Sequence, residues 1–137
     1  MTFNLLISCM YQTDTSIIER SNVQSDAVVV NQCDHDSISE FDFVNKYGRT
    51  CHVKFINTTE RGLSRSRNMA IRYAWADICL ICDDDEILAD DCEDLIIRAY
   101  EENPETGLIA FALIRNDNGK QYPKERKTLG FKQILKT

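Results

Sequence analysis

Short apolar runs alternate with amphipathic segments along most of the chain. Several of the runs are apolar throughout, which is typical of strands that are buried on both faces of a sheet. The predicted strands are Asn4–Ser8, Ala27–Asn31, Cys51–Ile56, Asp77–Cys82 and Gly107–Leu113. The predicted helices between or after them are Thr15–Val23, Phe41–Tyr47, Leu63–Trp75 and Asp91–Glu102.

The two later helices have the clearest signals. In Leu63–Trp75 the apolar positions recur with the i, i+3, i+4 spacing of one helix face. The helix Asp91–Glu102 is preceded by Asp90 as its N-cap, and Glu93 follows at capping-box spacing. The dipeptide Asn103-Pro104 then ends it, because proline cannot continue a helix.

Strands that alternate with helices predict βαβ units and right-handed crossovers. We therefore expect an α/β fold, with a Rossmann-like, mostly parallel sheet flanked by helices. A length of 137 residues and a hydrophobic content of 43% fit one domain, residues 1–137, with its own core. Ligands of such sheets bind beyond the carboxyl ends of the strands, so the residues after each strand are the candidates for function.

The acidity of the chain is local. The formal net charge is −6, and eight of the 22 acidic residues lie between Asp83 and Asp94, while the rest of the chain is near neutral. Such a patch favours cation binding. It also argues against duplex nucleic acid as a partner, because phosphate contacts need a basic surface.

The six cysteines are predicted to be reduced. Cys9, Cys79 and Cys82 lie inside predicted strands, where cysteine acts as a small apolar residue. Cys79 and Cys82 would point to opposite faces of their strand, which argues against a redox or zinc pair. The chain begins without a signal-peptide pattern, and no apolar stretch approaches the roughly 20 residues of a membrane span. We therefore expect a cytoplasmic protein.

Four carboxylates, Asp83 to Glu86, directly follow a predicted buried strand. In extended geometry Asp83 and Asp85 point to the same side, with Cα atoms roughly 6–7 Å apart. Both can face one hard divalent cation, such as Mn²⁺ or Mg²⁺, which prefers oxygen ligands. The alternative is a solvated acidic turn that leads to the Asp90 cap, but a position directly after a hydrophobic strand favours the metal site.

Three arginines, Arg61, Arg65 and Arg67, surround the start of the helix that precedes this strand. A helix N-terminus attracts anions, and arginine makes forked contacts to phosphate oxygens. Taken alone, the segment could be an ordinary exposed helix face. Beside a carboxylate–metal site it predicts the cationic side of a phosphate cradle.

The combined pattern resembles the family 2 glycosyltransferases. The segment Gly62-Leu63-Ser64-x-Ser66-Arg67-Asn68-x-Ala70 is followed by Asp83-x-Asp85, where the family has Gly-Leu-Ser-x-Ala-Arg-Asn-x-Gly and then a DxD motif after a buried strand. Tyr11-Gln12 stands where the family has Tyr-Asn. The resemblance runs from about Asn4 to Leu113. It implies the A-type (GT-A) nucleotide-diphospho-sugar transferase fold in truncated form, with the acceptor-binding half missing.

The resemblance also implies roles for single residues. Tyr11 would pack on the base, Asp83 would approach the ribose, and Asp85 would bind a metal that bridges the diphosphate. Asn31-Gln32 stands where the family has an Asp-Asp pair that reads uracil, which leaves the base open, and Asp34 is a possible substitute. The predicted nucleotide-binding residues are Tyr11, Asn31, Asp34, Arg61, Arg67, Asn68, Asp83 and Asp84, and the predicted metal ligands are Asp83 and Asp85.

The implied reaction moves a sugar from a nucleoside diphosphate, with a UDP-sugar favoured, to a hydroxyl of a saccharide or lipid-linked acceptor. The resemblance implies inversion, a role in cell-surface polysaccharide or glycolipid synthesis, and a general base in the missing half. One alternative is a module that binds nucleotide without turnover because of truncation. A sugar-phosphate nucleotidyltransferase needs a glycine-rich loop that Ser8–Gln12 lacks, and an aspartate-based phosphatase needs its aspartate after an earlier strand.

The tail Tyr122–Thr137 is basic, with apolar residues interspersed. It would suit contact with an anionic membrane surface at the inner face of the membrane, where lipid-linked acceptors occur. The interpretation that we favour is that it begins the missing half. An apolar sheet edge left uncovered there would favour self-association, such as a homodimer.

Overall fold

The computed structural model of the chain describes residues 1–111, 113–114, 121–122 and 128–129. The chain falls into two compact units, Met1–Ile97 and Arg98–Thr137, which are described separately.

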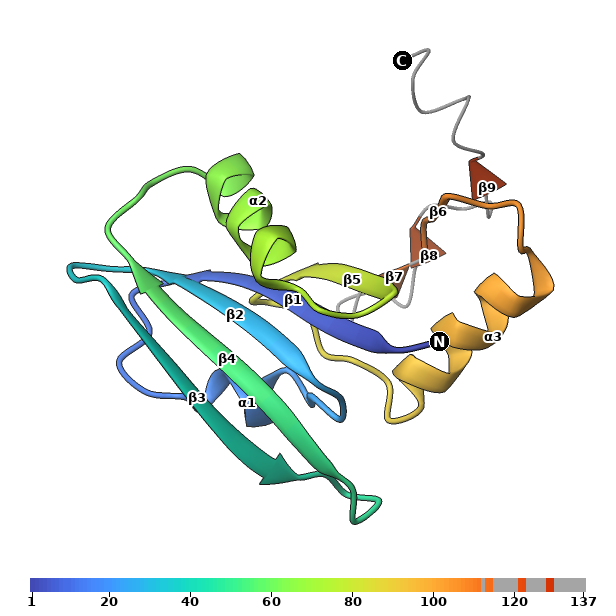
Figure 1. Ribbon diagram of the computed structural model, residues 1–137, viewed down its shortest axis with the longest axis horizontal. Coiled ribbons are helices and arrows are strands. Elements are labelled where there is room, and N and C mark those ends of the chain that lie inside the picture. Colours follow the sequence, from blue (N-terminus) through green and yellow to red (C-terminus); the bar gives the residue numbers. More distant parts are fainter. Residues whose placement is uncertain (112, 115–120, 123–127, 130–137) are drawn as a thin grey trace. The chain divides into compact units, whose positions relative to one another are not determined.

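A five-stranded sheet forms the first unit (Figure 1). The strand order is β3-β4-β2-β1-β5, in which neighbouring strands are parallel except for the antiparallel pair of β3 and β4. This arrangement confirms the predicted α/β class and the mostly parallel sheet. The strands are β1 (Phe3–Met10), β2 (Ala27–Gln32), β3 (Ser37–Val44), β4 (Thr50–Thr58) and β5 (Ile78–Asp83).

Three helices accompany the strands: α1 (Ile17–Arg20), α2 (Leu63–Tyr73) and α3 (Cys92–Glu102). The bounds of α2 and α3 agree with the predicted helices within two residues. The first helix is a single turn of the predicted Thr15–Val23, because Asn22 takes a positive φ of 53° and turns the chain away from the helix axis.

The predicted helix Phe41–Tyr47 is wrong, because most of this segment belongs to β3. Phe41 and Phe43 alternate with Glu40 and Asp42 in this segment, and its aromatic and β-branched residues favour a strand. It pairs antiparallel with β4 along its whole length, from Ser37↔Asn57 to Val44↔Thr50. The turn between the two strands contains Gly48, whose φ of 78° suits glycine.

The predicted capping box at α3 is replaced by tertiary contacts. The Asp90 carboxylate accepts hydrogen bonds from Asn22, at 2.8 Å, and from Lys46. The Glu93 carboxylate pairs with Arg49. These bonds tie the connection after β5 to the loop after α1 and to the β3–β4 turn.

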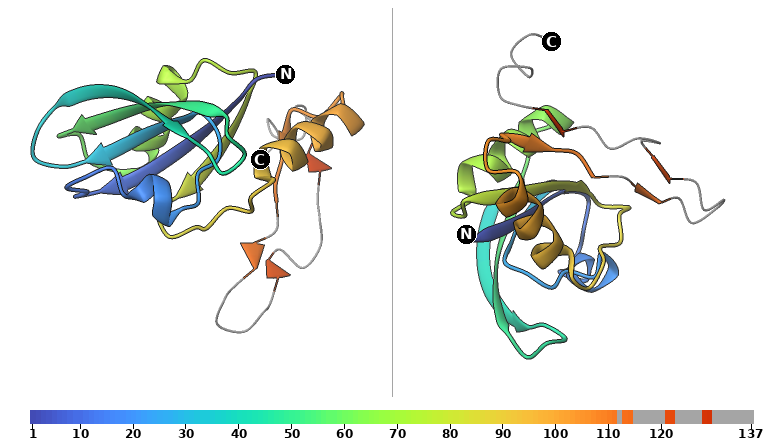
Figure 2. Two further views of the ribbon diagram at one scale, coloured as in Figure 1. Left: turned by 90° about the horizontal axis from the view of Figure 1, so that it is seen from below. Right: turned by 90° about the vertical axis from the view of Figure 1, so that its right-hand side faces the viewer.

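The core lies on both faces of the sheet. Helix α2 packs on β1 and β2, and its Ala70 joins a buried cluster with Leu6, Val28 and Ile56. The short helix α1 lies on the opposite face and buries Ile17 completely (Figures 1 and 2). Because strand side chains alternate between the faces, a central strand needs apolar residues on both, and residues 5–7 of β1 and 27–30 of β2 are apolar and buried throughout.

All six cysteines are free, and four of them are buried. Burial raises the pKa of the Cys9 thiol to about 12, with the Asp84 carboxylate adding to the rise. A thiol with such a pKa stays protonated at neutral pH and acts as an apolar core residue. Cys79 is exposed and Cys82 is buried, so the two lie on different faces of β5.

Among its described residues, the second unit contains the end of α3 and four two-residue strands in two antiparallel pairs, β6–β9 and β7–β8. These strands are β6 (Leu108–Ile109), β7 (Leu113–Ile114), β8 (Gln121–Tyr122) and β9 (Thr128–Leu129). The predicted strand Gly107–Leu113 therefore appears as two short pieces. The basic tail lies outside the described residues except at Tyr122, Thr128 and Leu129. Within the described part of the chain, no helix is long and apolar enough to cross a membrane.

Candidate functional site

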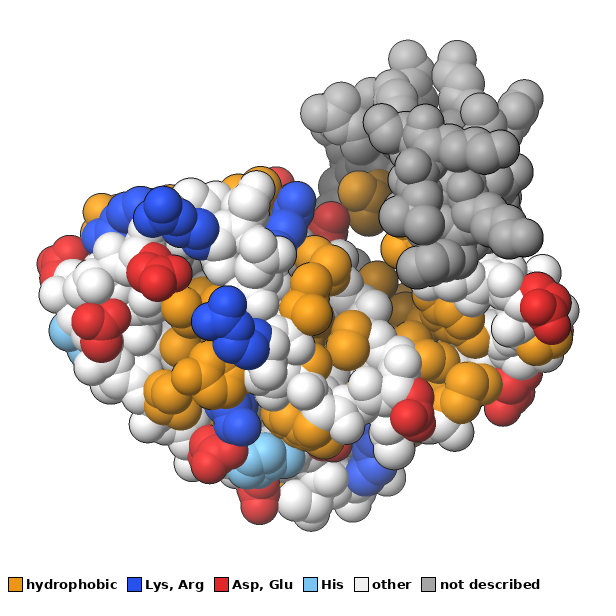
Figure 3. All heavy atoms as spheres, turned by 45° about the horizontal axis from the view of Figure 1, so that its top comes forward, with side chains coloured by type: hydrophobic (Ala, Val, Ile, Leu, Met, Phe, Trp, Pro, Cys, Tyr) orange, Lys and Arg blue, Asp and Glu red, His pale blue; other side chains and the backbone are white. Residues whose placement is uncertain are grey.

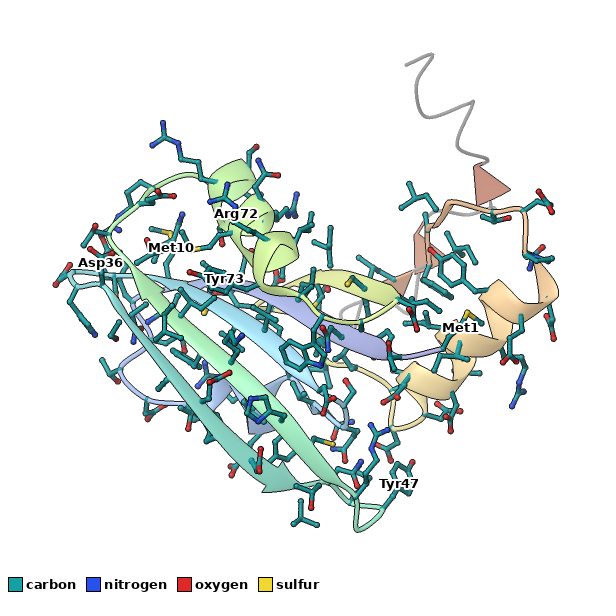
Figure 4. The ribbon with its side chains drawn as sticks, in the orientation of Figure 1. Met1, Met10, Asp36, Tyr47, Arg72 and Tyr73 are labelled. Carbon is teal, nitrogen blue, oxygen red and sulfur yellow. The ribbon has the colours of Figure 1, made fainter. Side chains whose placement is uncertain are left out.

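The four parallel strands all end on the same side of the sheet. Figure 4 shows Met10, at the end of β1, and Asp36, after β2, on this side, while Tyr47 in the β3–β4 turn lies at the opposite end. We call the residues that end or follow these strands, together with the first turn of α2, the carboxyl edge. Most of the residues selected from the sequence lie there.

The acidic run begins at Asp83, the last residue of β5. The main-chain N–H of Asp83 donates to the Glu86 carboxylate at 3.2 Å, while Asp84 and Asp85 are exposed. Burial raises the pKa of Glu86, and the negative charges of Asp83 and Asp85 raise it further. In the described part of the chain, no three His, Cys, Asp or Glu side chains converge on a point that could hold a metal. Among the described residues, a metal would therefore find at most the two carboxylates of Asp83 and Asp85.

The structure brings two of the predicted residues into direct contact. The Arg67 guanidinium donates to the Asp83 carboxylate at 2.9 Å, and the side chains are 38% and 44% exposed. The Nε of Arg67 is buried without a hydrogen-bond partner among the described residues. One residue earlier, the Ser66 hydroxyl donates to the Ser8 hydroxyl at 2.8 Å, which fixes the first turn of α2 against β1.

The start of α2 has no side-chain cap. Gly62 stands at the N-cap position with a φ of 113°, which is open to glycine alone, and it offers no side chain to the N–H groups of the first turn. Gln32 holds this loop, because its buried amide donates to the Gly62 carbonyl at 3.0 Å. Figure 3 shows Lys and Arg side chains gathered where the chain enters α2. Uncapped N–H groups beside arginines make a region that suits an anion.

Tyr11, Arg61 and Asp34 form a second group at the carboxyl edge. Tyr11 follows β1 and is 60% exposed. The Arg61 guanidinium lies 5.4 Å from the centre of the Tyr11 ring and donates to its hydroxyl at 3.4 Å. The Asp34 carboxylate, which is 90% exposed, is 4.0 Å from Arg61. Three residues that are far apart in the sequence thus form a chain of contacts, in which Arg61 lies over the Tyr11 ring and Asp34 lies beside Arg61.

Asn31 has a different place from the predicted one. Its side chain is fully buried, so it has no surface to offer to a base. Its amide accepts from the main-chain N–H of Gln12 at 2.9 Å and donates to the Gln12 carbonyl at 3.0 Å and to Asn57 at 2.8 Å. The expectation of direct base contact is therefore corrected: Asn31 shapes the chain after β1.

Sequence reasoning missed the residues that support the site, namely Ser8, Gln12, Gln32 and Ser66. A usable signal was present, because polar residues at the ends of buried apolar strands need hydrogen-bond partners. Asn68 is exposed on α2, and Asp84 is exposed after β5. Their predicted roles as nucleotide contacts stay predictions.

Two cavities lie away from Tyr11 and from the Arg67–Asp83 pair. One, of about 220 Å³, is lined by polar side chains that include Asn22, Asn45 and Arg49. The other, of about 630 Å³, lies between the α1 region and β3. Neither is lined by Tyr11 or by the Arg67–Asp83 pair. The residues of the carboxyl edge that are exposed include Tyr11, Asp34, Asp84 and Asp85.

The conformation of Tyr11 gives a testable stability difference. Its φ of 51° is left-handed, which costs a residue with a Cβ roughly 1–2 kcal/mol and glycine almost nothing. We expect Tyr11→Gly to be more stable than Tyr11→Ala by about 1 kcal/mol, the reverse of the usual order. Urea unfolding of both variants measures this difference in stability. Both variants lose the same ring, so a more stable alanine variant would show that residue 11 is not strained.

Comparison with protein families gives one further finding. The family model described as glycosyl transferase family 2 matches residues 8–137 of the chain. The matched span includes all the residues of the carboxyl edge described above. No curated protein matches the chain in a sequence search.

Proposed function

The chain belongs to glycosyl transferase family 2, and we propose that its carboxyl edge binds a nucleoside-diphosphate sugar. The chain is thus a glycosyltransferase domain, and its mostly parallel sheet is consistent with the GT-A fold. Membership implies transfer of a glycosyl group from a nucleotide sugar to an acceptor. The observation that carries the proposal for this edge is the contact between Arg67 and Asp83, which places a cation for phosphate beside carboxylates that suit a metal.

The diphosphate is proposed to lie between the start of α2 and the end of β5. The uncapped N–H groups of α2 and the Arg67 guanidinium supply positive potential there. The Arg67 side chain is 38% exposed, so its guanidinium can donate to a phosphate oxygen as well as to Asp83. Asn68 and Asp84, which follow Arg67 and Asp83 directly, are proposed to contact the same nucleotide.

Enzymes of this family commonly use a divalent metal. Asp83 and Asp85 fit such an ion in chemistry, since Mg²⁺ and Mn²⁺ prefer oxygen ligands. They fit it only as a partial site, because no third metal-binding side chain in the described chain joins them. Mg²⁺ is often held by one or two carboxylates plus substrate phosphates, which is the arrangement proposed for these residues. A metal bound there would stabilise the negative charge on the leaving diphosphate.

The base is proposed to pack on Tyr11, whose ring is exposed at the end of β1. Arg61 lies beside the ring and Asp34 lies beside Arg61, and the two would offer hydrogen-bond donors and acceptors to the edge of a base. Every nucleobase presents both kinds of group, so these two side chains suit a base without selecting one. By the resemblance, the favoured donor is a UDP-sugar.

The chemistry proposed for the transfer is a single displacement with inversion at the anomeric carbon, which needs a general base. Arg67 would stabilise the diphosphate as it leaves. The general base is not assigned to a residue of this chain. We propose that the chain is the donor-binding part of the catalytic machinery. By resemblance, the acceptor is proposed to be a saccharide or a lipid-linked sugar of polysaccharide or glycolipid synthesis, at the inner face of the membrane.

Thermal unfolding with UDP, with and without Mn²⁺, tests the donor site. A ligand at about 100 times its dissociation constant adds about 2.7 kcal/mol of stability, which is several degrees for a chain of this size. We expect such a rise with UDP and Mn²⁺ together, and the same rise in Arg72→Ala, because Arg72 is exposed on α2 and outside the proposed site (Figure 4). If GDP stabilises the protein and UDP does not, the nucleotide base of the proposed donor is guanine instead of uracil. If no nucleoside diphosphate stabilises the protein, the proposal is overturned.

A further inference from the structure

Tyr11 adopts a conformation that its own side chain does not favour. A φ of 51° is typical of glycine, or of asparagine and aspartate, whose short polar side chains bond locally. Tyrosine has no such group near its backbone. Strained residues of this kind persist only when the surrounding structure holds them, and they gather at binding sites.

The contacts that hold Tyr11 come from β2. The main-chain N–H of Tyr11 donates to the Gln32 carbonyl at 2.9 Å, which extends the pairing of β1 with β2 by one residue. At the next residue, Gln12, the hydrogen bonds come from the Asn31 side chain instead of the β2 backbone. This side chain accepts from the N–H of Gln12 at 2.9 Å and donates to the C=O of Gln12 at 3.0 Å. Both backbone groups of the residue after Tyr11 are therefore fixed by one amide.

An amide suits this position better than any other side chain of its size. It supplies an acceptor for the Gln12 N–H and two donors, one for the Gln12 carbonyl and one for Asn57 at 2.8 Å. A carboxylate of the same shape would face two acceptor oxygens, and an apolar side chain would leave both Gln12 groups without partners. The amide is fully buried, so water does not compete for these bonds.

We propose that Asn31 is a positioning residue that holds Tyr11 in its left-handed conformation and thereby sets the affinity for the base of the nucleotide. This inference rests on the proposed function, because it takes Tyr11 as the stacking platform. A platform fixed before binding loses no further freedom when the base arrives. If the turn relaxes, only the fraction of molecules with Tyr11 in place binds well, and the apparent affinity falls by that fraction.

The test compares UDP with inorganic diphosphate, which shares the phosphates of UDP and lacks its base. Stacking of a base on an aromatic ring contributes roughly 1–3 kcal/mol, so loss of much of it should be visible. We expect Asn31→Ala to weaken UDP binding about tenfold and diphosphate binding less than about twofold, both measured calorimetrically in excess Mg²⁺. In the Tyr11→Ala background, Asn31→Ala should cause no further loss of UDP affinity.

Asn45→Ala is the matched control. Asn45 is also a buried asparagine that fixes a turn, with its amide bonded to the main chain of Gln24, Tyr47 and Arg49, but at the other end of the sheet. Asn45→Ala should lower the stability of the protein and leave the ratio of UDP affinity to diphosphate affinity unchanged. If Asn31→Ala does not fold, Asn31→Asp removes the donors with less loss of volume and should change the same ratio.

The outcomes separate this inference from the proposed function. Three results for Asn31→Ala would each overturn the proposed role of Asn31. They are an equal loss of affinity for UDP and for diphosphate, an unchanged affinity for UDP, and a loss of UDP affinity in the Tyr11→Ala background as large as the loss without it. If the unaltered protein binds neither ligand, the donor site itself is refuted.

Discussion

Replacing Asp85 by alanine should remove most of the Mn²⁺ dependence of UDP affinity. In a chain that also carries the acceptor-binding part, it should lower turnover of the nucleotide sugar by at least about 100-fold, a size typical for loss of a group that stabilises charge in the transition state. The unfolding temperature without ligand should stay the same or rise slightly. Asp85 is exposed, lies in a run of four carboxylates, and raises the pKa of Glu86 by its charge. Removing it therefore relieves repulsion while it removes a proposed metal ligand.

Two measurements check this expectation: the dependence of UDP affinity on Mn²⁺ in this chain, and hydrolysis or transfer of a UDP-sugar by the chain that also carries the acceptor-binding part. Asp91→Ala is the control, because Asp91 is also exposed and lies in the same acidic stretch, outside the proposed site. Full turnover and an unchanged Mn²⁺ response in the Asp85 variant would show that Asp85 is not a metal ligand.

The central parallel strands β1 and β2 could be predicted because they are buried on both faces. β2 is buried at every position, and a run such as Ala27–Asn31 has few other structures available to it. β3 could not be predicted in the same way. Phe41 and Phe43 alternate with acidic residues, and it is pairing with β4 that makes this half-exposed segment an edge strand.

The positions of Arg67 and Asp83 in the fold could also be predicted, since the pattern marked the helix start and the strand end where they lie, while their roles in binding stay predictions. The position of Asn31 could not be predicted. Whether an asparagine at the end of a strand faces a ligand or the protein depends on what lies across from it, and here the Gln12 backbone from β1 takes its amide. The stacking of Arg61 on Tyr11 depends likewise on the approach of two loops that are 50 residues apart.

Arg67→Met should change two affinities in opposite directions. The affinity for UDP with Mn²⁺ should fall by about 10- to 100-fold, because hydrogen bonds to a charged group contribute roughly 1.5–3 kcal/mol. The affinity for Mn²⁺ alone should rise, because in the ligand-free protein Arg67 occupies the Asp83 carboxylate at 2.9 Å. Stability should change little, since both partners are more than a third exposed and such pairs contribute little.

Calorimetry measures UDP binding, and the electron paramagnetic resonance signal of free Mn²⁺ measures binding of the metal alone. Arg67→Lys should fall between the wild type and the methionine variant in UDP affinity, because lysine keeps the charge and loses the forked geometry. Arg72→Met, at the exposed far end of α2, should leave both affinities unchanged. Lower Mn²⁺ affinity in Arg67→Met would contradict a competition between the guanidinium and the metal for Asp83.

The same exchange of partners predicts cooperative binding in the unaltered protein. A diphosphate that draws Arg67 away from Asp83 frees that carboxylate for Mn²⁺, and Mn²⁺ at Asp83 in turn frees Arg67 for the diphosphate. Because such coupling is reciprocal, UDP should raise the affinity for Mn²⁺ by the same factor by which Mn²⁺ raises the affinity for UDP. In Arg67→Met this shared factor should become smaller, because Asp83 is already free before the nucleotide binds.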